Sequence, residues 1–303
     1  MLAARVPPHA YFVVSAVFHY LGPAFAVLLF ARVDALGVAW LRIASAAAIF
    51  ALWRRPWRLF ARLDGDGRRL LLAWGAVLAA MNACFYLAIE RLPLATVAAI
   101  EFLPVIALAA YGVRTARNGV ALALAVGGVY LLTGARFAGE PLAVGLAMAN
   151  AVLFALYIVL GHRVSRLGGM GGIDGLAGSM LVAALVATPM AGWAAAPALV
   201  DPVALAAGIG VGIASSVIPY VCDQLAMARL PRATYALLVA LLPATATVVG
   251  VVVLAQLPSV AEAVGVALVV GGVALHRAST AQPEAPARAS TRSAATRTAS
   301  SSI

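Results

Sequence analysis

The sequence predicts an all-α membrane protein with ten transmembrane helices. Of its 303 residues, 64% are hydrophobic and only 11% are charged, and the mean hydropathy is +1.01. About ten apolar stretches approach the roughly 20 residues that a helix needs to cross the hydrocarbon core of a bilayer. Most charged residues lie in the short gaps between these stretches. A water-soluble protein of this length would need more polar side chains to cover its surface. We therefore expect lipid to surround most of the chain.

Residues that favour helix ends separate the apolar stretches. Asp34, Asn118-Gly119, Asp201-Pro202 and Pro258 stand in such gaps, and Asp, Asn, Gly and Pro commonly begin or end helices. The first stretch is longer than the apolar part of a signal peptide, so we interpret it as a retained helix. The predicted spans are 10–31, 35–53, 70–89, 93–112, 119–134, 142–161, 174–192, 203–226, 233–255 and 260–276.

The arginines predict the orientation in the membrane. With the N-terminus in the cytoplasm, only Arg32, Arg91 and Arg136 face the outside, and an even number of spans returns the C-terminus to the cytoplasm. Cytoplasmic connections of membrane proteins are enriched in Arg and Lys. This topology also accounts for the net charge of +10, so we predict no nucleic-acid partner. The arginines that face the cytoplasm are those of the tail and Arg5, Arg54, Arg55, Arg58, Arg62, Arg68, Arg69, Arg114, Arg117, Arg163, Arg166, Arg229 and Arg232.

An internal repeat divides the chain into two halves. Arg91-Leu-Pro-Leu-Ala-Thr96 corresponds to Arg229-Leu-Pro-Arg-Ala-Thr234, and Cys84 falls on Cys222 in the same register. We predict two five-helix repeats, 10–134 and 142–276, followed by a disordered cytoplasmic tail, 278–303. Five helices are an odd number, so the second repeat enters the membrane from the opposite side. Inverted repeats are common in transporters that expose a midplane site alternately to the two sides; a duplication retained for stability is the alternative.

Several motifs carry a resemblance to a known family. They are Gly37-Val-Ala-Trp-Leu-Arg42, Arg55-Pro-Trp-Arg58, Met81-Asn82 with Phe85-Tyr-Leu87, Leu92-Pro-Leu94, Glu101-Phe102 with Pro104, Ala155-Leu-Tyr-Ile158, and Leu230-Pro231 with Thr234. Over about residues 20–276 the chain resembles the EamA-type members of the drug/metabolite transporter superfamily, and within them the bacterial threonine/homoserine exporters. The sequence departs from the pattern twice in the second half. Asp223-Gln224 stands near a position where the family pattern leads us to expect Glu, and Ala240-Leu-Leu-Pro243 in the ninth span contains no carboxylate.

The resemblance implies a secondary active transporter of the bacterial inner membrane. It implies export of small amino acids or related metabolites by alternating access, with a small-molecule substrate, protons and the lipid bilayer as partners. A transporter of another small metabolite or drug, and a structural membrane subunit without a transport cycle, remain alternatives. An intramembrane enzyme or lipid flippase would need two close carboxylates or a basic lateral opening, and the sequence shows neither clearly. The sequence gives no information on oligomeric state.

Arg42 and Glu101 are charged residues inside predicted spans. Counted from the helix starts, they lie roughly 12 Å and 13 Å from the same membrane surface, at a rise of 1.5 Å per residue. A lone charge at mid-membrane costs at least about 2.5–3.5 kcal/mol. One interpretation is a static ion pair between two helices. The other is a substrate site in which Arg42 binds a carboxylate, bidentately, and Glu101 binds an ammonium group or a proton.

Other polar residues are candidates for the same site. Asn82 and Tyr86 are four residues apart and therefore share a helix face; they line a cavity or make an interhelical hydrogen bond. The resemblance includes both residues and favours the cavity. Tyr157 and His19 lie in corresponding spans of the two repeats, beside Asn150 and Tyr20. For these two, substrate binding and ordinary helix packing both remain open.

Glu101 is the first candidate for proton coupling and Asp223 is the second. Asp223 lies about 7 Å from the inner surface on the same helical rise, where contact with Arg229 or Arg232 is the alternative. The sequence contains no Walker A motif, no HExxH, no CxxC and no Gly-x-Ser-x-Gly, the signatures of several nucleotide, metal and nucleophile sites. We therefore predict no enzymatic activity, no metal site and no cofactor.

Prolines and small residues mark the remaining features. Pro104 and Pro243 interrupt matching spans, and Pro219 interrupts the eighth. The carbonyls that they free either face the cavity or accompany simple kinks. The pairs Gly127-Gly128 and Gly271-Gly272 indicate close helix packing.

Overall fold

The computed structural model describes residues 7–112, 115–165, 172–227, 229 and 242–275, and every regular element in these ranges is helical. The elements are α1 (Pro8–Leu29), α2 (Ala35–Arg54), α3 (Trp57–Arg62), α4 (Gly65–Ile89), α5 (Leu94–Gly112), α6 (Ala116–Gly139), α7 (Pro141–Ser165), α8 (Gly172–Ala191), the 3-10 turn η2 (Gly192–Ala195), α9 (Ala196–Val200), α10 (Pro202–Gly212), the π-helical turn η3 (Ile213–Val217), α11 (Ile218–Met227), α13 (Leu242–Leu254) and α14 (Val260–Leu275).

Each predicted span overlaps a described helix. In the described part of the chain, six helical stretches are long and apolar enough to cross a membrane, and shorter apolar ones lie at Leu94–Pro104, Ala116–Leu132, Leu242–Leu254 and Val260–Leu275. The beginning of the predicted span 233–255 and the predicted tail 278–303 lie outside the described residues. Together, these apolar helices identify a multi-pass membrane protein.

The connection predicted at 54–69 contains more helix than expected. It includes α3, and α4 begins at Gly65 rather than at residue 70. Asp64 explains the earlier start, because its side chain accepts a hydrogen bond from the backbone N–H of Gly67 at 2.8 Å and so caps the helix. Asp34 caps α2 in the same way, accepting from Leu36 N–H.

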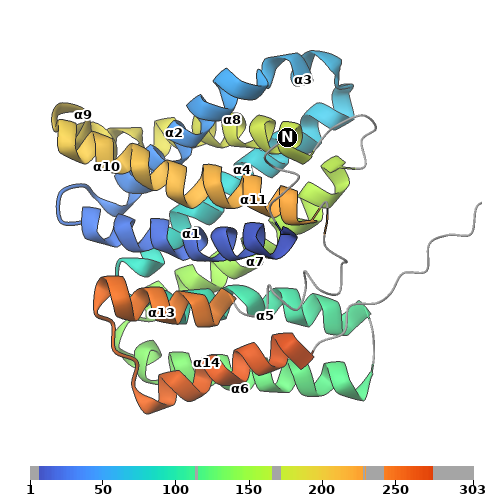
Figure 1. Cartoon of the computed structure of the whole chain (residues 1–303), viewed down its shortest axis with the longest axis vertical. Coiled ribbons are helices and arrows are strands. Elements are labelled where there is room, and N and C mark those ends of the chain that lie inside the picture. Colours follow the sequence, from blue (N-terminus) through green and yellow to red (C-terminus); the bar gives the residue numbers. More distant parts are fainter. Residues whose placement is uncertain (1–6, 113–114, 166–171, 228, 230–241, 276–303) are drawn as a thin grey trace, which may run out of the picture.

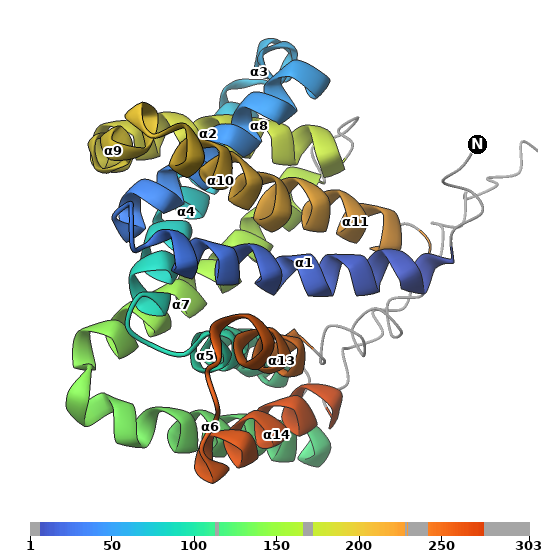
Figure 2. The same cartoon turned by 60° about the vertical axis from the view of Figure 1, so that its left-hand side comes forward.

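The helices are stacked side by side, with α1 in the middle of the molecule (Figures 1 and 2). On one side α1 packs against α10, η3 and α11, and on the other side against α13. The helix α2 packs against α8 and α10, and α4 packs against α7 and α8. Beyond α1, α5 contacts α6, α7 and α13, and α6 contacts α14. Two clusters of buried apolar side chains run through this stack of helices. The helices that carry most of the predicted site residues, α1, α2, α4, α5 and α7, contribute to them.

Glycines allow the close approach of α6 and α14. A Cβ atom added to Gly128 would lie 2.5 Å from the carbonyl oxygen of Gly265, and one added to Gly272 would lie 2.6 Å from that of Ala121. The neighbouring Gly127 and Gly271 face open space. The prediction of close packing at the two glycine pairs is therefore correct for the second glycine of each pair and wrong for the first, because adjacent residues point about 100° apart around a helix.

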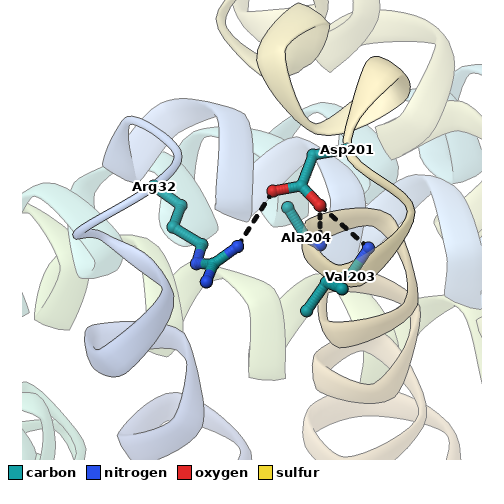
Figure 3. Close-up of polar contacts among 4 residues, drawn as sticks. All are labelled: Arg32, Asp201, Val203 and Ala204. Atoms are coloured by element: carbon teal, nitrogen blue, oxygen red, sulfur yellow. Dashed lines mark hydrogen bonds and ion pairs between the residues drawn. The ribbon is translucent and has the colours of Figure 1, made fainter.

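Asp201 joins two connections at one end of the bundle. Its carboxylate accepts hydrogen bonds from the backbone N–H groups of Val203 (2.9 Å) and Ala204 (3.2 Å) at the start of α10, and Arg32 Nη1 lies 3.1 Å away (Figure 3). These backbone N–H groups, that of Ala204 foremost, and the Arg32 guanidinium lower the pKa of Asp201. The pair links the α1–α2 connection to the α9–α10 connection.

At the opposite end of α2, Arg54 Nη2 lies 2.6 Å from Asp174 at the beginning of α8. Ion pairs therefore hold both ends of α2 against elements from later in the chain.

The glycine geometry predicts different effects from neighbouring substitutions. We expect Gly128→Ala and Gly272→Ala to lower the free energy of unfolding by about 1–3 kcal/mol, the usual cost of overpacking. We expect Gly127→Ala and Gly271→Ala to have no effect or to stabilise by up to about 1 kcal/mol, because Ala is the better helix former. Thermal unfolding in detergent, followed by tryptophan fluorescence, measures both pairs. Equal effects within a pair would contradict the described α6–α14 contact.

The environment of Asp201 predicts the pH dependence of this ion pair. A lowered pKa means that folding stabilises the charged carboxylate, so its contribution is present above the ordinary pKa and is lost as pH falls through the lowered one. Asp201→Asn keeps a capping side chain but removes the ion pair. We expect a small decrease in melting temperature that is constant from about pH 5 to about pH 8 and shrinks only as the pH falls below about 4, toward the lowered pKa. A difference that already shrinks between about pH 7 and pH 5 would contradict the lowered pKa.

Candidate functional site

Arg42 lies in the middle of α2 and is buried, with 6% of its surface exposed. Its Nε donates to the Ser216 hydroxyl oxygen at 2.9 Å, and its Nη2 donates to the Ser215 carbonyl oxygen at 3.1 Å. The guanidinium carbon lies 5.6 Å from the centre of the Tyr86 ring, within the range of a cation–π contact. All of these partners are electrically neutral, so they hold the guanidinium without compensating its charge.

The Ser215 carbonyl is available because of Pro219. In an α-helix a carbonyl accepts from the N–H group four residues later, and a proline at that position has no N–H group. The helix opens here into η3, where Ile218 N–H reaches back five residues to the Ile213 carbonyl. Pro219 therefore stands where the Ser215 carbonyl would find its donor in an α-helix, and Arg42 donates to this carbonyl.

Glu101 lies on α5 and is also buried, with 7% of its surface exposed. Asn150, a fully buried residue of α7, donates from Nδ2 to Glu101 Oε1 at 3.2 Å. The packing of α5 against α7 places these two side chains together. As with Arg42, the side chain that forms this hydrogen bond with the carboxylate is neutral.

Among the described residues, no ion pair joins Arg42 to Glu101. The two side chains interact electrostatically over a longer distance, but each is hydrogen-bonded to a different partner. The static ion pair that the sequence left open is therefore not formed in this structure. Two opposite charges in an apolar bundle without mutual contact are costly, and a ligand that carries both opposite charges would reduce this cost.

Buried polar atoms without a hydrogen-bond partner surround these two residues. Within the described ranges they include the Ser215 hydroxyl beside Arg42, Oδ1 of Asn150 beside Glu101, and the Tyr20 hydroxyl. Tyr20 also lies in the electrostatic range of Glu101. A buried polar atom without a partner costs free energy, and a polar ligand or a water molecule at these atoms would reduce that cost.

The other predicted residues differ in how closely they join this group. His19 and Tyr157 lie close enough to Arg42 to interact with its positive charge. The His19 ring packs 5.5 Å from the ring of Tyr20, and Tyr157 packs 5.3 Å from that of Trp74. Tyr86 contacts Arg42 directly, as described above.

Asn82 and Asp223 form hydrogen bonds outside the group around Arg42 and Glu101. Asn82 is buried, but its Nδ2 donates to the Leu78 carbonyl of its own helix at 2.8 Å. Asp223 accepts a hydrogen bond from the Ser15 hydroxyl at 2.6 Å, which joins α11 to α1. The structure therefore groups Arg42, Tyr86, Glu101, His19 and Tyr157, and it places Asp223 at a neighbouring position toward the end of α11.

The sequence interpretation missed Ser215 and Ser216 as site residues. Serine is common in apolar helices, where its hydroxyl often donates to the preceding turn, so the pair alone is not informative. The usable signal was the spacing, because a serine stands four residues before a helix-interrupting proline. The described residues contain no group of three or more His, Cys, Asp or Glu placed to share a metal ion.

Known proteins are similar to this chain in sequence and in fold. The EamA-like transporter family matches residues 141–277. The threonine/homoserine exporter RhtA of Escherichia coli (strain K12) is 34% identical over 238 residues, which cover 78% of this chain and 79% of the exporter. RhtA of Salmonella typhimurium (strain SL1344) is 33% identical with the same coverage. One crystal structure, 22% identical in sequence, has the same fold, with a TM-score of 0.57 over 88% of this chain and 97% of that chain.

The similarity to the RhtA exporters extends over most of both chains. The chain therefore belongs to the EamA-like transporter family of the drug/metabolite transporter superfamily, in which it is similar to the RhtA exporters.

Proposed function

We propose that this protein is a secondary active transporter that exports small amino acids such as threonine and homoserine, or related metabolites, by alternating access. The observation that carries this proposal is the pair of buried, opposite charges, Arg42 and Glu101, that are not paired with each other. The names of the curated relatives supply the substrate class. A packing role alone would not require two costly charges that remain apart.

The transport cycle rests on ten transmembrane helices in two inverted repeats, 10–134 and 142–276. Support comes from the packing pattern, which is preserved when equivalent helices are exchanged between the halves. In this exchange α1 corresponds to α7, α2 to α8, and α4 to the span made of α10 and α11. The contact of α1 with α11 therefore corresponds to that of α7 with α4, and the contact of α2 with α10 corresponds to that of α8 with α4. The self-equivalent pairs, α2 with α8, α5 with α13 and α6 with α14, are also in contact. Two such halves can exchange conformations and move one site between two sides.

The same proposal places the chain in the bacterial inner membrane with both termini in the cytoplasm. The distribution of arginine supports this orientation. The Arg32–Asp201 pair then lies at the outer end of α2, and Arg54–Asp174 lies at the cytoplasmic end. Each pair joins the first repeat to the second, so opening the site to either side separates one of them.

The substrate site takes a zwitterion. The Arg42 guanidinium binds the substrate carboxylate, and Glu101, with the free Oδ1 of Asn150 beside it, binds the ammonium group. The Tyr86 ring lies 5.6 Å from the guanidinium carbon, and Asn82, Tyr157 and His19 line the rest of the proposed site. When substrate binds, each buried charge gains an opposite partner, and Arg42–carboxylate hydrogen bonds are of the strong, charge-assisted kind.

Proton coupling is assigned to Glu101 and Asp223. Glu101 can bind either a proton or the ammonium group of the substrate, and this competition is the simplest way to exchange one for the other. Asp223 is bound by Ser15 between α1 and α11, toward the proposed cytoplasmic end. A carboxylate between two packed helices is suited to pass protons when the helices separate.

Substitution of the two charges tests the site. In proteoliposomes containing purified protein, we expect Arg42→Ala and Glu101→Gln each to reduce threonine transport at least about tenfold, equivalent to ~1.4 kcal/mol, because each removes one charge that the zwitterion needs. Arg69→Ala and Glu90→Gln are matched controls at exposed positions. If both site variants fold and transport at the wild-type rate, the site is wrong. A panel of other amino acids and metabolites in the same assay identifies the substrate.

Asp223→Asn tests the second proton group. We expect transport driven by a pH gradient to fall by about fivefold or more, while exchange of labelled for unlabelled threonine without a gradient continues, because exchange requires no net proton movement. Ser15→Ala is the control, since it removes a hydroxyl that donates to Asp223 and keeps the Asp223 carboxylate. An equal loss of both activities would show a structural role for Asp223, and no loss of either would exclude it from coupling.

A further inference from the structure

We propose that Ser215, Ser216 and Pro219 form a positioning element that fixes one edge of the Arg42 guanidinium and leaves the other edge for the substrate carboxylate. This inference rests on the proposed function, because it assigns the residues that make Arg42 selective for a carboxylate. The three residues are positioning residues, since they act through Arg42.

The backbone of η3 leaves the Ser215 carbonyl without the donor that a regular α-helix would supply. Pro219 cannot donate to the carbonyl four residues before it, so the Ser215 carbonyl, which is surrounded by apolar helices, needs another donor. Arg42 Nη2 supplies it at 3.1 Å. The Ser216 hydroxyl, from the next residue, accepts from Arg42 Nε at 2.9 Å. A local break in one helix thus creates two adjacent acceptors for one side chain of another helix.

A second feature is the geometry of the guanidinium. Its five N–H groups lie in one plane as a rigid fork. Nε and one N–H of Nη2 donate these two hydrogen bonds. The Tyr86 hydroxyl also interacts with the guanidinium, but among the described residues it has no hydrogen-bond partner of good geometry. The edge formed by Nη1 and the second N–H of Nη2 therefore remains available. It has the two parallel donors that bind a carboxylate bidentately, and the Tyr86 ring supports the guanidinium.

A third feature is the packing that holds η3 in place. A Cβ atom at Gly22 of α1 would overlap Ser215, and one at Gly212 would overlap Ser45 of α2. Ser215 and Ser216 are both 1% exposed. The turn is therefore enclosed between α1 and α2 and cannot shift far without moving one of them. A site whose supporting residues are held in this way orders its binding group before the ligand arrives, which lowers the cost of binding.

The chemical consequence is selectivity for a carboxylate over its neutral analogues. The two acceptors of η3 are uncharged, so they orient Arg42 and leave its positive charge to be compensated by the ligand. An amino-acid amide has the same ammonium group and side chain but no negative charge. It cannot compensate Arg42, and its NH2 group would face the donors of the guanidinium.

The test compares threonine with threoninamide as competitors of labelled threonine uptake in proteoliposomes. The measured quantity is the ratio of their half-inhibitory concentrations, which does not depend on the amount of active protein. We expect wild type to favour threonine by about 100-fold or more, as sites built around a specific polar group do. Ser216→Ala should reduce this ratio about tenfold, mainly through a higher KM for threonine. Pro219→Ala should also reduce it, because the new N–H group competes with Arg42 for the Ser215 carbonyl.

Two controls match these variants. Ser179→Ala removes a buried hydroxyl that donates to the Leu176 carbonyl of α8, and Pro189→Ala removes a proline from inside the same helix. Both should keep the wild-type ratio. If Ser216→Ala is folded and keeps the wild-type ratio, the inference is overturned, and Ser216→Ala decides alone if Pro219→Ala does not fold.

The outcomes separate this inference from the proposed function. If wild type does not distinguish the two compounds and Arg42→Ala transports normally, the proposed site itself is wrong. If wild type distinguishes them, Arg42→Ala abolishes transport, and Ser216→Ala and Pro219→Ala behave as wild type, the site is retained and only the positioning role of η3 is lost.

Discussion

The structure depends on the requirement that every backbone polar group find a partner where lipid replaces water. This requirement explains why the regular elements of the described residues are helices, since a helix satisfies its own N–H and carbonyl groups. It also makes Pro219 consequential, because the carbonyl that the proline leaves without a helical donor cannot turn to solvent. Arg42 satisfies this carbonyl. The need of one backbone atom and the position of the buried charge are therefore linked.

A second constraint is that the helices approach closely without the help of the hydrophobic effect, because lipid is as apolar as their surfaces. Small residues provide this approach at α6–α14, where Gly128 and Gly272 face backbone carbonyls of the other helix, and at η3, which Gly22 of α1 contacts. Close backbones leave little room for adjustment. Polar side chains between them therefore occupy defined positions, and Arg42 and Glu101 are held by separate partners rather than collapsing onto each other.

The separated charges connect the fold to the transport function. Each charge has neutral hydrogen-bond partners, which reduce the cost of burial without neutralising it. In the proposed transport cycle, a zwitterionic substrate would complete both electrostatic interactions, and its release would restore the neutral partners. Such partners would allow both binding and release, whereas an internal ion pair would compete with the substrate in every cycle. Partly exposed ion pairs at the two ends of α2 link it to elements of the second half of the chain.

The sequence alone determined the apolar helices, most of their ends, and the two buried charges at similar depth, because hydropathy, Asp caps and lone charges are local signals. It also indicated that Pro219 breaks a span. Only the tertiary structure decided which donor uses the freed carbonyl, that Arg42 and Glu101 are not paired, and that Asn150 binds Glu101 while Asn82 bonds to its own helix. These outcomes depend on the rotation and contact of helices more than 40 residues apart in the sequence, and no local pattern specifies them.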